Sequence, residues 1–417
     1  MTKQQQSPRR IIVGVSGGIA AYKACHLVRD LKEAGDDVRV VPTSNALNFV
    51  GAATFEALSG HPVATSVYEA VDQVQHVRLG QEADAIVIAP ATADLMARLV
   101  AGRADDLLTA TVLVATCPVI VAPAMHTEMW LNAATQANVD TLRSRGIIVL
   151  EPAHGRLTGT DTGPGRLPEA GQIAQLVRVA LAGHRLPHDW AGRTVLITAG
   201  GTQENLDPVR FLGNRSSGRQ GFALAEIAAH RGAQVTIIAG DTEDLPVPSG
   251  AVVEKVTSAR EMAASVDKHA GSADVIIMAA AVADFRPKAQ AGAKLKKGAD
   301  DSALASIELV ENPDILATTV QRRSAGELAA STLIIGFAAE TGDERLSALE
   351  HAQAKLARKG CDLLMCNEVG TGKVFGQSHN QGWLLAADGR VTEIPEGSKH
   401  AVAAEILAAV DDLASLD

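Results

Sequence analysis

His76 is the first residue whose type suits catalysis. It lies in "QVQHVRLG", where Val74, Val77 and Leu79 supply an apolar side. Because imidazole titrates near neutral pH, a histidine can accept a proton from a thiol or steer a carboxylate. A single histidine in such a setting is by default a hydrogen-bonded packing residue. The segment by itself therefore allows both interpretations.

Two short apolar runs end abruptly in small residues and glycine. They are "IIVGVSGG" at Ile11–Gly18 and "VLITAGGT" at Val195–Thr202. Where a strand turns directly into a helix, backbone N–H groups and the helix dipole favour a phosphate. Neither turn is a complete dinucleotide fingerprint, and glycine at a strand end often serves only the turn. The two turns are therefore candidate anion sites of unspecified ligand.

The elements that must position these residues alternate regularly. Apolar runs such as "AIVIAP" and "VIVAPAM" alternate with segments of helical periodicity, and a second series begins at "TVLITA". Continuous apolar strands separated by helices indicate a mostly parallel sheet with helices on both faces. The Gly, Pro and His residues of "LAGHRLPHDWAGR" interrupt the series. We predict an α/β protein of two tandem Rossmann-like domains, residues 1–182 and 194–417, joined by a linker at 183–193.

Composition narrows the class of protein. The 417 residues carry a formal net charge of -10, and the 38 Lys and Arg residues are scattered along the chain. Such a charge disfavours nucleic acid as a partner. The polar start "MTKQQQSPRR" has no apolar stretch of the length of a signal peptide or membrane span, so we expect a cytoplasmic protein with no membrane partner. The four cysteines have no metal or disulfide spacing, which is typical of buried free thiols.

Five motifs in the first half carry a family resemblance. They are "GVSGGIAAYK", "QHVRLG", "APATADLMARLVAGRADDLLT", "APAMHTEMW" and "GTDTGPGRL". Together they resemble the family of flavin mononucleotide (FMN)-dependent cysteine decarboxylases, and within it the phosphopantothenoylcysteine decarboxylases. The resemblance implies bound FMN, with His76 as the essential histidine and His126 facing the substrate. It assigns the cofactor to Ser16, Gly17, Gly18, Thr43, Ala91, Thr92 and Met125. Thr43 ends a strand, so it could equally cap a helix.

Two positions depart from this family's pattern. His126 stands where the motif usually has an asparagine that holds the substrate carboxylate, and a histidine can still donate a hydrogen bond there. The glycine-rich flap "LTGTDTGPGRL" lacks the usual cysteine that protonates the enethiolate and offers Thr158, Thr160 or Asp161 instead. A threonine hydroxyl is a far weaker acid than a thiol. We therefore expect the flap to serve chiefly as a cover, with Thr158→Ala and Thr160→Val keeping most activity.

The second half resembles the phosphopantothenate-cysteine ligases. The resemblance rests on "ITAGGTQENLDPVRFLGNRSSGRQGFALA", "AAAVADF", "KLKK" and "NPDIL". It implies that Arg210 and Asn214 hold phosphopantothenate and its activated acyl intermediate. The cytidine triphosphate (CTP) site that it implies comprises Ala279, Ala280, Ala281, Asp284, Lys294, Asn312, Pro313, Asp314, Phe337, Lys355 and Lys359. Lys294 would neutralise the triphosphate, with Mg²⁺ assisting through ligands that the sequence does not identify. Lys355 and Lys359 are four residues apart, so a helix would present both to one anion, although lysine runs are usually solvated faces.

The order of the motifs is similar to that of the bacterial bifunctional family of coenzyme A biosynthesis over nearly the whole chain. The resemblance implies that the second domain makes an acyl-cytidylate of 4'-phosphopantothenate, which cysteine then attacks. In the first domain, oxidation of the cysteine thiol by the flavin would let carbon dioxide leave, before the hydride returns to give 4'-phosphopantetheine. It also implies a dodecamer built from decarboxylase trimers and ligase dimers. The alternatives are a nicotinamide-dependent oxidoreductase and a flavin-binding regulatory protein of the same fold.

Overall fold

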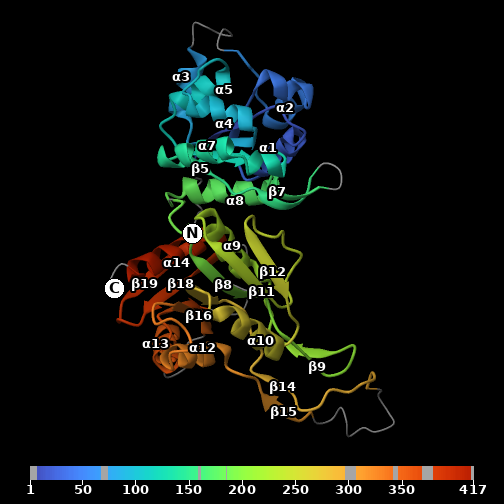
Figure 1. Ribbon diagram of the computed structural model, residues 1–417, viewed down its shortest axis with the longest axis vertical. Coiled ribbons are helices and arrows are strands. Elements are labelled where there is room, and N and C mark those ends of the chain that lie inside the picture. The colour runs from blue at the N-terminus through green and yellow to red at the C-terminus, as the bar shows by residue number, and fades with distance from the viewer. Residues whose placement is uncertain are drawn as a thin grey trace. The chain divides into compact units, whose positions relative to one another are not determined.

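The computed structural model describes residues 7–66, 74–157, 161–184, 186–295, 307–340, 346–368 and 379–414. The chain divides into two compact units, Met1–His188 and Asp189–Asp417, each with its own core (Figure 1). The predicted linker at residues 183–193 spans this division. The α/β class predicted from the apolar runs is confirmed in both units.

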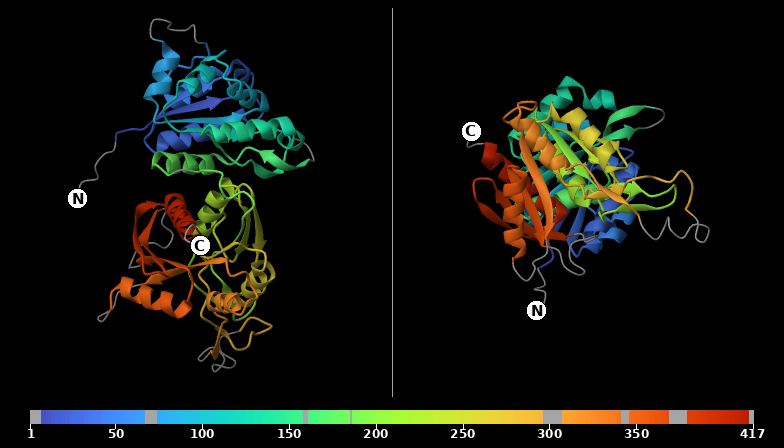
Figure 2. Two further views of the ribbon diagram at one scale, coloured as in Figure 1. Left: turned by 60° about the vertical axis from the view of Figure 1, so that its left-hand side comes forward. Right: turned by 90° about the horizontal axis from the view of Figure 1, so that it is seen from below.

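Unit 1 is a doubly covered parallel sheet. Its elements are β1 (Arg10–Val15), α1 (Ala21–Glu33), β2 (Asp37–Pro42), the 3-10 helix η1 (Ser44–Asn48), α2 (Ala52–Ser59), α3 (Gln75–Glu82), β3 (Ala85–Ala91), α4 (Ala93–Val100), α5 (Leu107–Leu113), β4 (Val119–Pro123), α6 (Thr127–Trp130), α7 (Ala133–Ser144), β5 (Ile148–Val149), β6 (Ala153–Arg156), β7 (Thr162–Arg166) and α8 (Ala170–Leu181). The parallel strands follow the order β2-β1-β3-β4-β5. Helices α1 and α8 pack together on one face, and α4 and α7 on the other (Figure 2).

Unit 2 contains a larger, mixed sheet. Its elements are β8 (Thr194–Ala199), β9 (Gln203–Asn205), β10 (Phe211–Gly213), α9 (Arg219–His230), β11 (Gln234–Ala239), β12 (Ala251–Lys255), α10 (Ala259–Ala270), β13 (Val275–Met278), β14 (Phe285–Pro287), β15 (Leu309–Glu311), α12 (Ile315–Ser324), β16 (Leu333–Glu340), α13 (Ala348–Lys359), β17 (Leu363–Glu368), β18 (His379–Ala386), β19 (Val391–Ser398) and α14 (Lys399–Ala414). The sheet order is β12-β11-β8-β13-β16-β17-β18-β19. The helix expected to carry Lys355 and Lys359 is α13.

The last two strands of this sheet run antiparallel to their neighbours. Helices α9 and α14 pack on one face of the sheet. Helices α10, α12 and α13 cover the other face, with two buried apolar clusters beneath them. Two short antiparallel ribbons, β9 with β10 and β14 with β15, lie outside the main sheet, and β9 contacts β14 (Figure 1). These ribbons bring the segments after β8 and β13 together.

A buried aromatic residue anchors the start of unit 2. Trp190 is fully buried, and its Nε1 donates a hydrogen bond to Asp411 Oδ1 of α14 at 2.7 Å. The Arg231 guanidinium lies 4.5 Å above the indole ring, a cation–π contact. Arg231 also donates from Nη2 to Asp189 at 2.7 Å and to Asp411 at 2.6 Å. The entering segment, α9 and α14 are thus fixed to one another.

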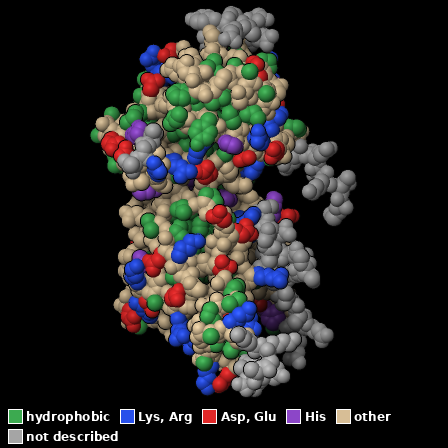
Figure 3. Space-filling view, turned by 90° about the vertical axis from the view of Figure 1, so that its right-hand side faces the viewer, with side chains coloured by type: hydrophobic (Ala, Val, Ile, Leu, Met, Phe, Trp, Pro, Cys, Tyr) green, Lys and Arg blue, Asp and Glu red, His purple; other side chains and the backbone are tan. Residues whose placement is uncertain are grey.

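On the face seen in Figure 3, side chains of one charge do not gather into a large patch. Positive and negative side chains are interspersed there over both units.

Two of the four cysteines, Cys361 and Cys366, are buried, while Cys25 and Cys117 are only partly buried, which differs from the expectation for all four. Within the described ranges, no helix has the length and apolar character that crossing a membrane requires.

Candidate functional sites

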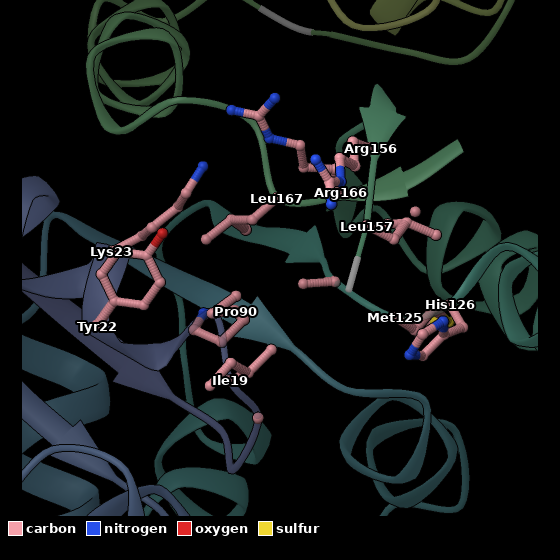
Figure 4. Close-up of a pocket in the computed structure, with 14 residues that line it drawn as sticks. Ile19, Tyr22, Lys23, Pro90, Met125, His126, Arg156, Leu157, Arg166 and Leu167 are labelled. Carbon is pink, nitrogen blue, oxygen red and sulfur yellow. The ribbon is translucent and has the colours of Figure 1, made fainter. Parts of the chain in front are cut away.

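A cavity of about 280 Å³ opens at the carboxyl ends of the unit 1 strands (Figure 4). Its walls come from the turn after β1, the end of β3, the segment after β4, and the hairpin β6–β7. The lining residues are Gly18, Ile19, Ala20, Tyr22, Lys23, Pro90, Ala124, Met125, His126, Arg156, Leu157, Gly165, Arg166 and Leu167. Ligands of open α/β sheets bind at this edge.

The turn after β1 has the features of an anion site. Ser16 is buried, and its hydroxyl donates to Pro90 O at 2.8 Å and accepts from Thr92 N–H at 2.9 Å. Ser16 thus ties the turn to β3 through its side chain. A Cβ on Gly17 would lie 2.5 Å from Asn45 Cβ, so the close packing of this turn against η1 requires glycine at this position. Among the described residues, the N–H groups of Gly17 and Gly18 have no hydrogen-bond acceptor, and they stand at the start of α1.

Thr43 and Thr92 both act as helix caps. Thr43 Oγ1 accepts from Ala46 N–H at the start of η1, at 3.3 Å. Thr92 Oγ1 accepts from Leu95 N–H at the start of α4, also at 3.3 Å. Ala91, the last residue of β3, is buried. The capping alternative for Thr43 is therefore realised, and a contact from Thr43 or Thr92 to a cofactor stays a prediction.

The segment after β4 is held by the flap hairpin. Met125 N–H donates to Gly165 O at 2.9 Å, and Gly165 has a φ of +136°. A Cβ on Gly165 would lie 2.3 Å from Met125 O, so the two backbones touch. Met125 is partly buried and His126 is exposed, and both line the cavity. Thr158 and Thr160 lie outside the described residues.

Three cationic side chains line this cavity, and sequence reasoning missed their role. They are Lys23 of α1, Arg156 of β6 and Arg166 of β7 (Figure 4). Lys23 Nζ contacts Glu169 Oε1 at 3.1 Å, and the Arg166 guanidinium pairs with the same carboxylate. The available signals were the lysine that closes "GVSGGIAAYK" and the arginine that closes "GTDTGPGR". Their charge suits an anionic ligand.

His76 lies in the first turn of α3 and does not line this cavity. Its Nδ1 is buried and has no hydrogen-bond partner among the residues that the structure describes. Gly80 lets α3 pack closely against α5, because a Cβ at this position would lie 2.6 Å from Thr111 O of α5. Val74, which precedes α3, has a φ of +43°, a strained conformation for a β-branched residue. The close packing of α3 against α5 thus positions the helix that carries His76.

A second cavity, of about 460 Å³, lies at the carboxyl edge of the unit 2 sheet. Its walls are the turn after β8, β10 with the loop that follows it, and the segment after β11. The lining residues are Gly201, Thr202, Gln203, Phe211, Gly213, Asn214, Arg215, Ser216, Ser217, Asp241 and Glu243. The second glycine turn singled out from the sequence thus forms part of a cavity.

Glycines let three loops meet backbone to backbone at this cavity. Gly201 and Asp241 exchange hydrogen bonds of 2.9 and 2.7 Å, and a Cβ on Gly240 would lie 2.3 Å from Gly201 O. Gly200 O accepts from Ala281 N–H at 2.8 Å. The structure therefore brings the "AAAVADF" segment, with Ala279, Ala280 and Ala281, beside the turn after β8.

Asn214 and Arg210 occupy different parts of the same loop. Asn214 lines the cavity, and its Nδ2 donates to Val282 O at 2.9 Å. Arg210 is partly buried and binds Asp207 through Nε at 3.0 Å and Nη2 at 2.6 Å. Arg210 is not among the residues that line this cavity.

The remaining residues of the predicted CTP site gather around β13 and β16. Asn312 N–H donates to Asp284 O, and its Nδ2 donates to Ala283 O, both at 2.8 Å. Pro313 separates Asn312 from Asp314, which caps α12 through Ala317 N–H. Phe337 lies in β16, beside β13. Asn312 and Asp284, which come from different motifs, are therefore neighbours in space.

The two lysines of α13 are paired with different carboxylates. Lys355 Nζ contacts Glu340 Oε1 at 2.8 Å, and Lys359 contacts Asp314. Burial alone would raise the pKa of Asp314, but hydrogen bonds from Lys359 and from Ala317 N–H outweigh it and leave that pKa lowered. A common anion between the lysines stays a prediction. Lys294 is exposed, and its neighbour Leu295 is joined to the Asp207–Arg210 turn.

Two family models match the chain, one over each unit. The family described as "Flavoprotein" matches residues 1–181, and "DNA/pantothenate metabolism flavoprotein C-terminal domain" matches residues 190–413. A solved structure of the C-terminal domain of the coenzyme A biosynthesis bifunctional protein CoaBC covers 55% of this chain and 100% of its own, with 36% identity and a TM-score of 0.45.

Curated relatives extend over nearly the whole chain. The CoaBC protein of Mycolicibacterium smegmatis is 60% identical, covering 98% of this chain and 97% of its own. That of Mycobacterium tuberculosis is 59% identical, covering 98% of each chain, and that of Vibrio cholerae is 41% identical, covering 97% and 98%. With both half-chain families matched in order, the chain belongs to the family of bifunctional coenzyme A biosynthesis proteins, enzymes that join a flavoprotein decarboxylase unit to a ligase unit.

Proposed function

We propose that unit 2 joins 4'-phosphopantothenate to cysteine with CTP, and that unit 1 decarboxylates the product to 4'-phosphopantetheine. The observation that carries this proposal is the pair of cavities, each built from the motifs that resemble one of the two enzymes. The product of one unit would be the substrate of the other. A cytoplasmic location follows from this substrate class.

In unit 2, we assign the triphosphate to Lys294, Lys355 and Lys359, and the acyl-cytidylate to Asn214. Positive charge near a departing pyrophosphate stabilises the transition state more than the ground state. The carboxylates of Glu340 and Asp314 hold the two α13 lysines in place until the nucleotide binds. Mg²⁺ would share the neutralisation, as a hard cation on phosphate oxygens.

In unit 1, the residues fit a flavin mononucleotide on two observations. The unpaired N–H groups of Gly17 and Gly18 suit its phosphate, and the cavity offers the apolar side chains of Ile19, Pro90 and Met125. Bound flavin would supply two-electron oxidation of the cysteine thiol. Lys23 and Arg166 would bind an anionic part of the ligand, and the Gly163–Gly165 strand would exclude water.

His76 is assigned the proton transfer with the substrate, although it does not line the Gly18 cavity of its own chain. The decarboxylase trimers that the resemblance implies would resolve this, because a neighbouring subunit can complete a site. The test mixes a His76→Asn protein with a protein whose substitution lies in the cavity that Gly18 lines. We expect carbon dioxide release to be restored in mixed oligomers. Its absence would argue for a site within one chain.

One coupled experiment tests the proposal as a whole. The purified protein is supplied with phosphopantothenate, cysteine, CTP and Mg²⁺, and both pyrophosphate and carbon dioxide are followed. We expect equal amounts of the two products and a flavin absorbance spectrum. Pyrophosphate without carbon dioxide would refute the unit 1 assignment, and no pyrophosphate would refute the unit 2 assignment. A colourless protein that cannot take up flavin would also refute the former.

A further inference from the structure

The carboxylate of Asp207 is fully buried in the turn between β9 and β10. It accepts hydrogen bonds from the N–H groups of Val209 and Arg210, each at 2.8 Å, and from Arg210 Nε at 3.0 Å and Nη2 at 2.6 Å. A further donor is Leu295 N–H at 3.2 Å. The carboxylate is therefore saturated with donors, of which one comes from a distant segment.

That distant segment is the one that carries Lys294. Arg210 Nη2 also donates to Leu295 O at 2.8 Å, so both backbone groups of Leu295 are held by the Asp207–Arg210 pair. At the other end of the segment, Ala291 N–H donates to Leu206 O at 2.9 Å. Lys294 itself is exposed. The turn therefore fixes the backbone on both sides of Lys294 and leaves its ammonium group accessible.

The charge of Asp207 makes this attachment firm. The hydrogen bond from Arg210 lowers the pKa of Asp207 far below its usual range, against the opposing effect of burial. The group is ionised at neutral pH, and hydrogen bonds to an ionised acceptor are about twice as strong as neutral ones. A buried carboxylate that loses a donor is left with an unsatisfied charge. Moving Leu295 away from the turn is therefore unfavourable.

We propose that Asp207 is a positioning residue for nucleotide activation: with Arg210 it holds residues 291–295 so that Lys294 stands at the CTP triphosphate. The inference rests on the proposed ligase function of unit 2. It also joins the two substrates, because the same turn continues through β10 to Asn214. The loop that lines the phosphopantothenate cavity thereby sets where the lysine stands.

The test uses the full-length protein and four substitutions. Asp207→Asn keeps the shape but removes the charge, and Arg210→Lys is a second variant in case the first folds poorly. Asp388→Asn is the matched control, because Asp388 binds Arg390 in a similar Asp–Arg pair at the β18–β19 turn. Lys294→Gln supplies the background for a double-mutant cycle.

We expect Asp207→Asn to lower kcat for pyrophosphate release by about tenfold or more, because misplacing a catalytic group by about 1 Å can cost on the order of a hundredfold. The KM for phosphopantothenate should stay nearly constant. In the Lys294→Gln background the same substitution should lower kcat less than about twofold, since its effect passes through the lysine. Asp388→Asn should leave kcat unchanged.

Three results would overturn the inference. The first is an equal loss of kcat in both backgrounds, and the second is a raised KM for phosphopantothenate with kcat unchanged. The third is independent of activity and is an unchanged rate of trypsin cleavage after Lys294, as measured by mass spectrometry. We expect this cleavage to quicken several-fold in Asp207→Asn and not in Asp388→Asn. Unchanged cleavage contradicts the inference even in a protein without ligase activity. Failure of the proposed function alone would show as absent pyrophosphate release in the wild-type protein.

Discussion

At the scale of single residues, several of the cations that we assign to anionic ligands are paired with a carboxylate. Lys23 and Arg166 share Glu169, whereas Lys355 and Lys359 have separate acidic partners. An incoming phosphate must displace these carboxylates or bind beside them. If these residues bind anions as proposed, the pairs would hold the cations in position before binding and would reduce the positive charge that a wrong anion meets.

His76→Asn should abolish carbon dioxide release and leave pyrophosphate release intact. Asparagine keeps a polar group of similar size but cannot exchange a proton near neutral pH. Both products are measured in the coupled reaction, with the flavin spectrum as the control for a loaded and folded unit 1. If both activities fell together in a flavin-loaded variant, the two chemistries would not be independent.

The pH dependence of stability should reveal Cys361. Burial raises the pKa of its thiol to about 11, from an ordinary value of 9.0. Between these pH values the unfolded chain releases the proton and the folded chain keeps it, so stability falls as pH rises. The loss reaches about 2 to 3 kcal/mol at 1.36 kcal/mol per pKa unit.

The measurement compares melting temperatures of unit 2 at pH 8 and pH 10.5 in the wild-type protein and in Cys361→Ser, whose hydroxyl does not titrate in this range. The wild-type protein should lose more stability than the variant over this interval. Parallel curves for the two proteins would show that the thiol does not contribute.

Motifs predicted which residues belong to a site, whereas the hydrogen-bond partners of those residues could not be predicted from the sequence. The motifs predicted ligand contacts for Met125, Gly18 and Asn214, and the structure shows that these residues line cavities. They did not predict that Arg210 is already bound to Asp207, or that Ser16 bridges two strands, because a side chain's partner is chosen by tertiary contacts between distant segments. The chemical roles of all these residues stay predictions.

At the scale of elements, the flap strand β7 should be sensitive to the smallest added side chain. Gly165→Ala places a Cβ against Met125 O and requires a φ that alanine disfavours. We expect carbon dioxide release to fall at least about tenfold, because the strand can no longer pair with Met125. Gly171→Ala is the matched control, since a Cβ there meets nothing within 4 Å. Full activity in Gly165→Ala would show that the flap need not pair.

The parallel strands were predictable because buried apolar runs are long and unambiguous. The ribbons β9–β10 and β14–β15 were not, since strands of three residues carry too little periodicity. The antiparallel hairpin β18–β19 was missed, although Asp388–Gly389 between apolar residues is a hairpin signal and Gly389 has a φ of +92°. The two-residue turn signal was overlooked because the alternation of strands and helices dominated the interpretation of the sequence.

At the scale of the whole molecule, separate cores predict separate unfolding transitions. Trp190→Ala removes a fully buried side chain and leaves Arg231 without its cation–π contact. A buried Trp→Ala change costs about 3–5 kcal/mol. The transition of unit 2 should fall in temperature, while flavin release from unit 1 should occur at the wild-type temperature.

Differential scanning calorimetry with simultaneous flavin fluorescence measures both transitions. Trp130→Ala, which removes a buried tryptophan of unit 1, is the complementary control and should lower only the flavin-linked transition. A single transition that moves with either substitution would contradict the independence of the two cores.

The shared contacts of Arg231 have a topological consequence. Its Nη2 reaches both Asp189, where unit 2 begins, and Asp411, near the end of α14. Unit 2 therefore starts and finishes at one place, as in domains that tolerate circular permutation and insertion into other proteins. We expect that a gene for this unit could be opened at the Asp388–Gly389 turn, with a short peptide joining the segments that carry Asp189 and Asp411. We expect the permuted unit 2 to keep its fold, because the two segments that would be joined already meet at Arg231.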